Sequence, residues 1–63
     1  MNAVTFNQLM TQVYKFNSLA LAKSFAEHAT KRSDIVHGDD GKFWVARWQV
    51  ALKLVDAGYE YAK

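Results

Sequence analysis

The chain has 63 residues, of which 51% are hydrophobic and 22% are charged, a balance that excludes a disordered chain and is typical of a globular protein. A net charge of +2, spread over Lys and Arg residues with one adjacent pair, does not indicate a dedicated nucleic-acid-binding module. No apolar run approaches the roughly 18 residues of a membrane span, so no membrane partner is expected.

The length predicts one small domain, residues 1–63. Its core is marginal by itself, because so short a chain buries only about 60% of its unfolded surface. The absence of cysteine excludes disulfides and thiolate metal sites and favours a cytoplasmic location. Self-association is then the remaining means of added stability.

A first helix is predicted to begin at Thr5, whose hydroxyl can cap the first turn while Gln8 completes a capping box. Val4 and Leu9 have the spacing of a hydrophobic staple. Apolar residues recur at steps of three and four, namely Phe6, Leu9, Met10, Val13 and Tyr14. This stripe predicts an amphipathic helix.

The sequence fits two alternatives for where this helix ends. Asn17 and Ser18 are good N-caps and poor helix-interior residues, which favours two helices hinged at Asn17. The apolar stripe nevertheless continues in phase through Ala20, Leu21, Phe25 and His28. One long helix over residues 6–31 therefore fits as well. In either case Lys31 and Arg32 fall in a last helical turn, where positive charge complements the helix dipole.

A β-hairpin is predicted over residues 33–46, because two short apolar runs flank Asp39-Asp40-Gly41. Asp and Gly favour a three-residue loop closed by a left-handed glycine. This register places Ile35 opposite Val45 and Val36 opposite Trp44, so each face of the hairpin carries an apolar pair. Both faces should therefore be covered by other elements.

Trp48 is predicted to open the last helix, whose polar residues form one narrow stripe of Gln49, Lys53, Asp56 and Glu60. Such a helix is either the central core helix or one shared with a partner chain. Gly58 is predicted to follow the helix end, leaving Tyr59-Glu60-Tyr61 extended as a short third strand. The predicted fold class is α+β: one or two N-terminal helices, a β-hairpin, then a hydrophobic C-terminal helix with that strand.

No catalytic or metal-binding pattern is present. The candidates are His28, His37, Glu27, Asp34, Asp39, Asp40, Asp56 and Glu60. Consecutive Glu27 and His28 point about 100° apart on a helix, and two widely spaced histidines without cysteine make a poor zinc site. Asp39-Asp40-Gly41 lacks the alternating acids and distal Glu of a calcium loop. We therefore expect neither catalysis nor a cofactor or metal ion.

The aromatic residues near the hairpin and last helix exceed what so small a core encloses on both hairpin faces. Trp and Tyr often anchor protein interfaces. The candidate protein-binding residues are Trp44, Trp48, Tyr59 and Tyr61. One alternative is that these aromatics are simply core. Another is a nucleic-acid-binding protein, in which hairpin aromatics stack on bases. Its phosphate-binding candidates are Lys31, Arg32, Lys42 and Arg47.

The segment Asp40-Gly41-Lys42-Phe43-Trp44-Val45, followed by Leu54 and Ala57-Gly58-Tyr59-Glu60, resembles a pattern in short uncharacterised proteins of phages and other mobile elements. The resemblance covers less than half of the chain and implies a hairpin-helix unit without an active site. Where those sequences have Thr-Pro, this chain has Arg47-Trp48, so the last helix starts without that cap. The resemblance implies a small accessory protein that binds a host protein. The expected function is non-catalytic protein binding, as a homodimer and with an unidentified protein partner.

Overall fold

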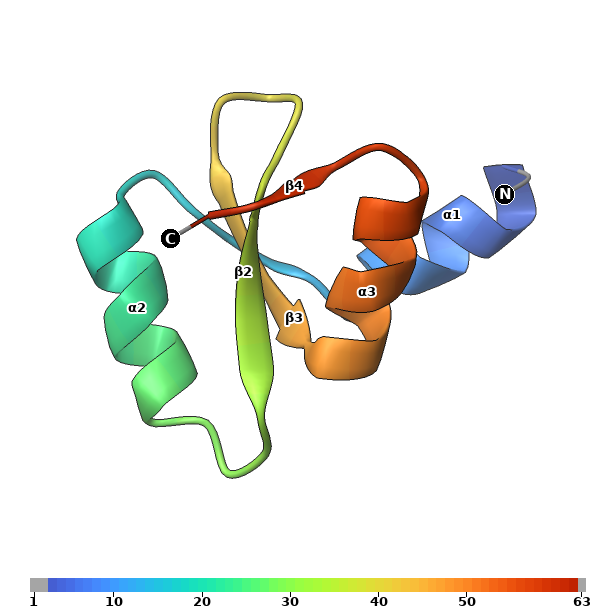
Figure 1. Cartoon of the computed structure of the whole chain (residues 1–63). Helices are drawn as coiled ribbons and strands as arrows, with labels where there is room; N and C mark the ends of the chain where they lie inside the picture. Colours follow the sequence, from blue (N-terminus) through green and yellow to red (C-terminus); the bar gives the residue numbers. More distant parts are fainter. Residues whose placement is uncertain (1–2, 63) are drawn as a thin grey trace.

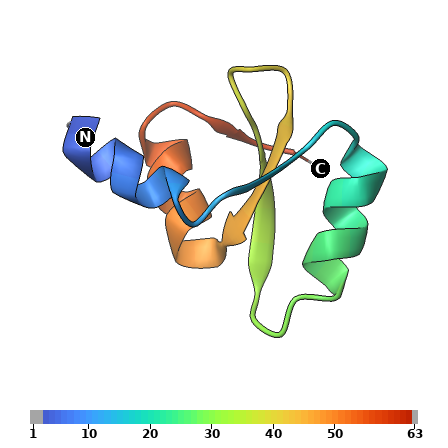
Figure 2. The ribbon, with the colours of Figure 1, turned by 180° about the vertical axis from the view of Figure 1, so that it is seen from behind.

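The computed structural model describes residues 3–62 and has an α+β fold. In chain order its elements are α1 (Ala3–Met10), β1 (Tyr14–Phe16), α2 (Leu19–Glu27), β2 (Ser33–His37), β3 (Phe43–Arg47), α3 (Trp48–Asp56) and β4 (Glu60–Tyr61). The strands form one antiparallel sheet ordered β1-β3-β2-β4 (Figure 1). Helix α2 covers one face, and α1 and α3 cover the other, as the view from behind also shows (Figure 2). Within residues 3–62, no helix has the length and apolar character needed to span a bilayer.

The β2–β3 hairpin confirms the predicted register, with Ile35 opposite Val45 and Val36 opposite Trp44. Neighbouring side chains of a strand point to opposite faces, so the two pairs enter different cores. The core under α1 and α3 contains Leu9, Val36, Trp44, Ala46, Val50, Ala51 and Leu54. The core under α2 contains Ala22, Ile35, Val45 and Ala62. Both faces of the hairpin are therefore covered.

The hairpin loop also has the predicted form. The N–H of Gly38 donates to the carbonyl of Lys42 at 2.8 Å, which closes a loop of residues 39–41. Gly41 has φ of +79°, a left-handed conformation that glycine adopts at no steric cost. The turn is thus encoded locally by residue type.

The predicted start of the first helix is wrong. Helix α1 already has helical geometry at Ala3, so Thr5 lies inside it and no helix terminus is left there for its hydroxyl to cap. Gln8 is therefore not part of a capping box. The side chain of Val4, half of the expected staple, lies outside the described residues.

The structure has two helices within residues 3–31, as one alternative predicted, but strand β1 separates α1 from α2 instead of a hinge at Asn17. Tyr14, which continues the apolar stripe of α1 in phase, instead lies opposite Val45 of β3. Pairing with β1 satisfies backbone groups that β3 would otherwise leave open at the sheet edge. Strand β3 is distant in sequence from β1. Pairing with β3 therefore determines the conformation of Tyr14, although the local apolar pattern favours a helix.

Helix α2 begins after Ser18, as the two-helix alternative predicted, but it ends before residue 31. Ser18 is its N-cap, and the Ser18 Oγ accepts a hydrogen bond from a backbone N–H of the first turn at 3.1 Å. The helix ends at Glu27, and the Nδ1–H of His28 donates to the carbonyl one turn earlier at 2.7 Å. Lys31 and Arg32 therefore lie in the connection to β2, and their interpretation as helix-ending charges is wrong.

The carboxyl-terminal prediction is confirmed. Helix α3 begins at Trp48, and Gly58, with φ of +113°, follows its C-cap. The N–H groups of Gly58 and Tyr59 donate to the carbonyls of Val55 and Leu54 at 3.0 and 3.1 Å, the Schellman pattern that ends many helices. The chain then continues as β4, which pairs with β2 at the sheet edge.

Candidate binding surfaces

Trp44, the first of the predicted protein-binding residues, lies in the core with 2% of its surface exposed. Its indole Nε1–H donates to Asp40 Oδ1 at 3.1 Å. The Tyr59 ring centroid lies 5.1 Å from its own, and the Lys15 ammonium lies 4.9 Å from the indole centroid. A side chain enclosed in this way has no surface to offer a partner, so the structure assigns Trp44 to folding.

Asp40 is the acceptor that holds the hairpin loop against the sheet. Its Oδ1 accepts hydrogen bonds from the Lys42 N–H at 3.0 Å and the Trp44 indole at 3.1 Å, while Oδ2 lies 3.5 Å from the Lys15 ammonium. Desolvation raises the pKa of the Asp40 carboxyl, but these hydrogen bonds and the Lys15 charge together outweigh it. The pKa of Asp40 therefore lies below its ordinary value of 3.8. This carboxylate has a structural role in the turn.

Tyr59 is half-buried beside the same loop. Its ring stacks on Phe6 with centroids 6.2 Å apart, and its hydroxyl donates to Asp39 Oδ2 at 3.3 Å. Burial, together with the negative charge of Asp39, raises the pKa of Tyr59 above its ordinary value of 10.0. Tyr59 therefore joins α1, the loop and the end of α3.

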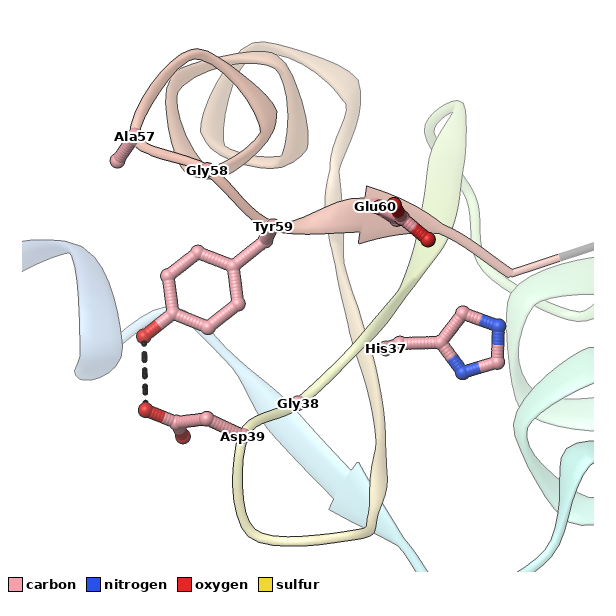
Figure 3. A pocket seen from close by; sticks show the side chains of 7 residues that line it. All are labelled: His37, Gly38, Asp39, Ala57, Gly58, Tyr59 and Glu60. Carbon is pink, nitrogen blue, oxygen red and sulfur yellow. Dashed lines mark hydrogen bonds between the residues drawn. The ribbon is translucent and has the colours of Figure 1, made fainter.

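A shallow hollow of about 430 Å³ lies beside Tyr59 (Figure 3). It is lined by His37, Gly38, Asp39, Ala57, Gly58, Tyr59 and Glu60. Figure 3 shows Tyr59 and Asp39 bonded on one side, with the His37 ring directed away from both. That ring instead lies 5.5 Å from the ring of Phe43. The hollow thus does not pair the imidazole with the Asp39 carboxylate, as general acid–base chemistry would need. Among residues 3–62, no group of three or more His, Cys, Asp or Glu side chains is placed to hold a metal ion.

Helix α3 carries two apolar stripes. The first, of Val50, Ala51 and Leu54, is buried in the core. The second contains Trp48 and Leu52, which are 41% and 44% exposed, and the half-buried Val55. Their spacing of four and three places them on one side of the helix.

Tyr61 is a further exposed aromatic residue on the α3 side of the sheet. It is exposed in β4, a strand that packs beside α3. It lies opposite Val36, so its side chain is on the α3 side of the sheet. We call Trp48, Leu52, Val55 and Tyr61 the α3 surface. Two predicted protein-binding residues, Trp48 and Tyr61, are therefore exposed on the α3 side of the sheet, whereas Trp44 is buried and Tyr59 is half-buried.

A second exposed apolar area lies on the α2 side. Tyr14 and Leu21 are 58% and 59% exposed, and Phe25 is also exposed. The Tyr14 and Phe25 rings lie 4.9 Å apart between centroids. Sequence reasoning missed this area, because it assigned Tyr14 and Phe25 to a buried helical stripe. The alternation of Tyr14 and Phe16 about Lys15 was the signal available for a strand.

Three of the four predicted phosphate-binding residues gather at one end of the hairpin. Arg47 lies opposite Ser33 in the sheet, and Lys31 and Arg47 line one groove of about 410 Å³ beside the Tyr14 ring. Arg32 lies nearby, 3.9 Å from Asp34 and with its guanidinium 5.9 Å from the Trp48 ring centroid.

Lys42 is separate from this group. It sits beside the hairpin loop, before β3 begins, whereas Arg47 is the last residue of that strand. Arg47 also precedes α3 without capping it through its side chain, as the sequence indicated.

No protein-family model, curated protein or solved structure matches this chain. We therefore infer the function from the two exposed surfaces.

Proposed function

We propose that this chain is a non-catalytic binding protein that forms a homodimer through the α3 surface. The proposal rests on the second apolar stripe of α3, formed by Trp48, Leu52 and Val55, and on Tyr61, which is exposed on the same side of the sheet. Within one chain, the buried stripe and part of Val55 pack on the core, whereas Trp48 and Leu52 remain exposed. Large apolar side chains that continue around the same helix are typical of a contact surface.

A second copy of the chain is the partner that this surface fits best. In a two-fold dimer the same patch meets itself, so one contact covers the exposed stripe on both copies. Two α3 helices would pack with Leu52 near the axis and the Trp48 rings toward the ends. A chain of this size has a marginal core, and burial of apolar area between copies adds stability that the monomer lacks.

The area that a dimer interface requires is a small share of the accessible surface of this chain. A stable interface buries at least about 1,200 Å² in total, or about 600 Å² from each partner. That is about one seventh of the 4355 Å² accessible surface of this chain. The long dimensions of the molecule, 31 and 24 Å between backbone extremes, leave room for such a face.

The α3 surface is also where we place the unidentified protein partner. A host protein that offers an apolar helix would take the place of the second copy, as expected of an accessory protein of a phage or mobile element. Binding of the two partners would then be mutually exclusive.

Leu52→Glu tests the proposal, with Leu21→Glu as its matched control. Both changes put the same charge on an exposed leucine of a nine-residue helix, on opposite sides of the sheet. An unpaired carboxylate buried in an apolar interface costs several kcal/mol, so Leu52→Glu should weaken dimerisation at least about 100-fold. Sedimentation equilibrium measures the dissociation constants. A Leu52→Glu protein that dimerises as tightly as the Leu21→Glu protein would refute the proposed interface.

A further inference from the structure

We propose that the groove between α2 and the sheet binds single-stranded nucleic acid, with a base stacked on Tyr14 and its phosphate held by Lys31 and Arg47. The groove is lined by residues on the α2 side. The α3 surface belongs to a helix that lies on the other face of the sheet from α2 (Figure 1). The inference therefore goes beyond the homodimer and does not depend on it.

Aromatic neighbours fix the position of the Tyr14 ring in the groove. Tyr14 stands on the edge strand β1, and its ring lies at 42° to the Phe25 ring. Phe16, with its ring centroid 5.2 Å from that of Phe25, supports the pair from behind. Because Tyr14 remains 58% exposed while its neighbours fix it, its ring is open to a flat ligand at a small entropic cost. Nucleic-acid bases stack on such rings whatever their sequence.

Lys31 and Arg47, the two cationic residues of the groove, have no acidic residue beside them in its lining. The groove is lined by Thr11, Gln12, Tyr14, Phe25, Ala29, Thr30, Lys31, Ser33, Val45, Ala46 and Arg47, with no Asp or Glu among them. Within residues 3–62, Lys31 and Arg47 make no ion pair, whereas Lys15 lies near Asp40 and Arg32 near Asp34. Two cations with no compensating acid favour an anion between them.

The shape and polarity of the groove favour a single strand over other anionic ligands. Its volume of about 410 Å³ falls within the range of small-ligand sites, so it can take one unstacked base with its phosphate. In a duplex the same base is stacked between its neighbours and its face is not accessible to Tyr14. An acidic peptide without aromatic residues, such as polyglutamate, offers charge but no planar ring to stack on Tyr14. Hydroxyl and amide groups on the rim can hydrogen-bond to the base edge or the sugar.

The test is fluorescence anisotropy with a labelled oligothymidylate at low salt. Tyr14→Ala should weaken binding about 5- to 150-fold, the usual range for loss of one stacked base, and Tyr14→Phe should restore it. Arg47→Ala should lower affinity and reduce the slope of log affinity against log salt by about 0.7. Lys42→Ala removes the same charge far from the groove and should leave both quantities unchanged. Circular dichroism checks that each variant is folded.

Three outcomes would overturn the proposal. The first is no binding of the oligonucleotide at low salt by the wild-type chain. The second is competition by a duplex or by polyglutamate as strong as that by unlabelled oligothymidylate. The third is equal loss of affinity in the Arg47→Ala and Lys42→Ala proteins, which would indicate a diffuse charge effect. If Tyr14→Ala fails to fold, the comparison of affinity between the Arg47→Ala and Lys42→Ala proteins still tests the site. The Leu52→Glu protein should bind the oligonucleotide normally, so failure of this site and failure of the dimer are distinguishable.

Discussion

Replacing Trp44 by phenylalanine should destabilise the fold and leave self-association unchanged. Trp44 is buried, and the variant replaces its indole by a smaller phenyl ring and removes the N–H that donates to Asp40. The ring atoms lost correspond to two or three buried carbons, or about 2 kcal/mol of packing. A domain of this length has only about 3 to 9 kcal/mol in total. Alanine at this position would cost about 3 to 5 kcal/mol and could unfold the chain, so phenylalanine is the better probe.

Urea denaturation followed by far-ultraviolet circular dichroism measures this effect without depending on tryptophan fluorescence. With a slope near 1 kcal/mol per molar urea, about 2 kcal/mol lowers the midpoint by about 2 M. Both proteins must be compared at one protomer concentration, because dimerisation raises apparent stability. Trp48→Phe is the matched control, and it should keep most of its monomer stability while weakening the dimer. An unchanged midpoint for Trp44→Phe, with loss of the dimer, would show that Trp44 is an interface residue and that its assignment to the core is wrong.

Two further predictions concern the hairpin loop. A Cβ at Gly38 would overlap the Trp44 indole. A Cβ at Gly41 would contact no other atom, so Gly41→Ala costs only about 1 kcal/mol for the left-handed backbone. Gly38→Ala should therefore lower the thermal midpoint much more than Gly41→Ala does. Equal shifts would mean that the indole does not rest on Gly38. The folded-state pKa of Asp40 is lowered from 3.8, so its contribution to stability is fully present above pH 3.8 and is lost as the pH falls through the folded-state pKa. Asp40→Asn should flatten this acid limb of the stability–pH curve; an identical limb in the variant would assign the acid sensitivity to other carboxylates.

The hairpin and the end of α3 were predictable because their signals are local. Asp and Gly determine the loop, alternation determines which residues pair, and Gly58 determines where α3 ends. Strand β1 was not predictable in this way. Tyr14 is in phase with the helical stripe, and it becomes a strand residue only because β3 offers it an open edge.

The candidate surfaces depended on the same long-range information. The sequence correctly identified a surplus of aromatic residues, but Trp44 and Trp48 look equivalent until the sheet and α3 are placed. Trp44 then points into a core closed by α1 and α3, and Trp48 lies on the side of α3 that no element within residues 3–62 buries completely. Lys31 and Arg47 are likewise distant in sequence and come together because β2 pairs with β3.

The mass of the wild-type protein in solution shows most directly whether the chain forms a homodimer. Size-exclusion chromatography with light scattering, at low and high salt and at two protein concentrations, measures it without a known partner. We expect a species of about twice the 7.2 kDa chain mass that salt does not dissociate, since apolar contacts are not screened. A 7.2 kDa monomer at the higher concentration, or a dimer that high salt dissociates, would contradict an interface built on the apolar stripe of α3.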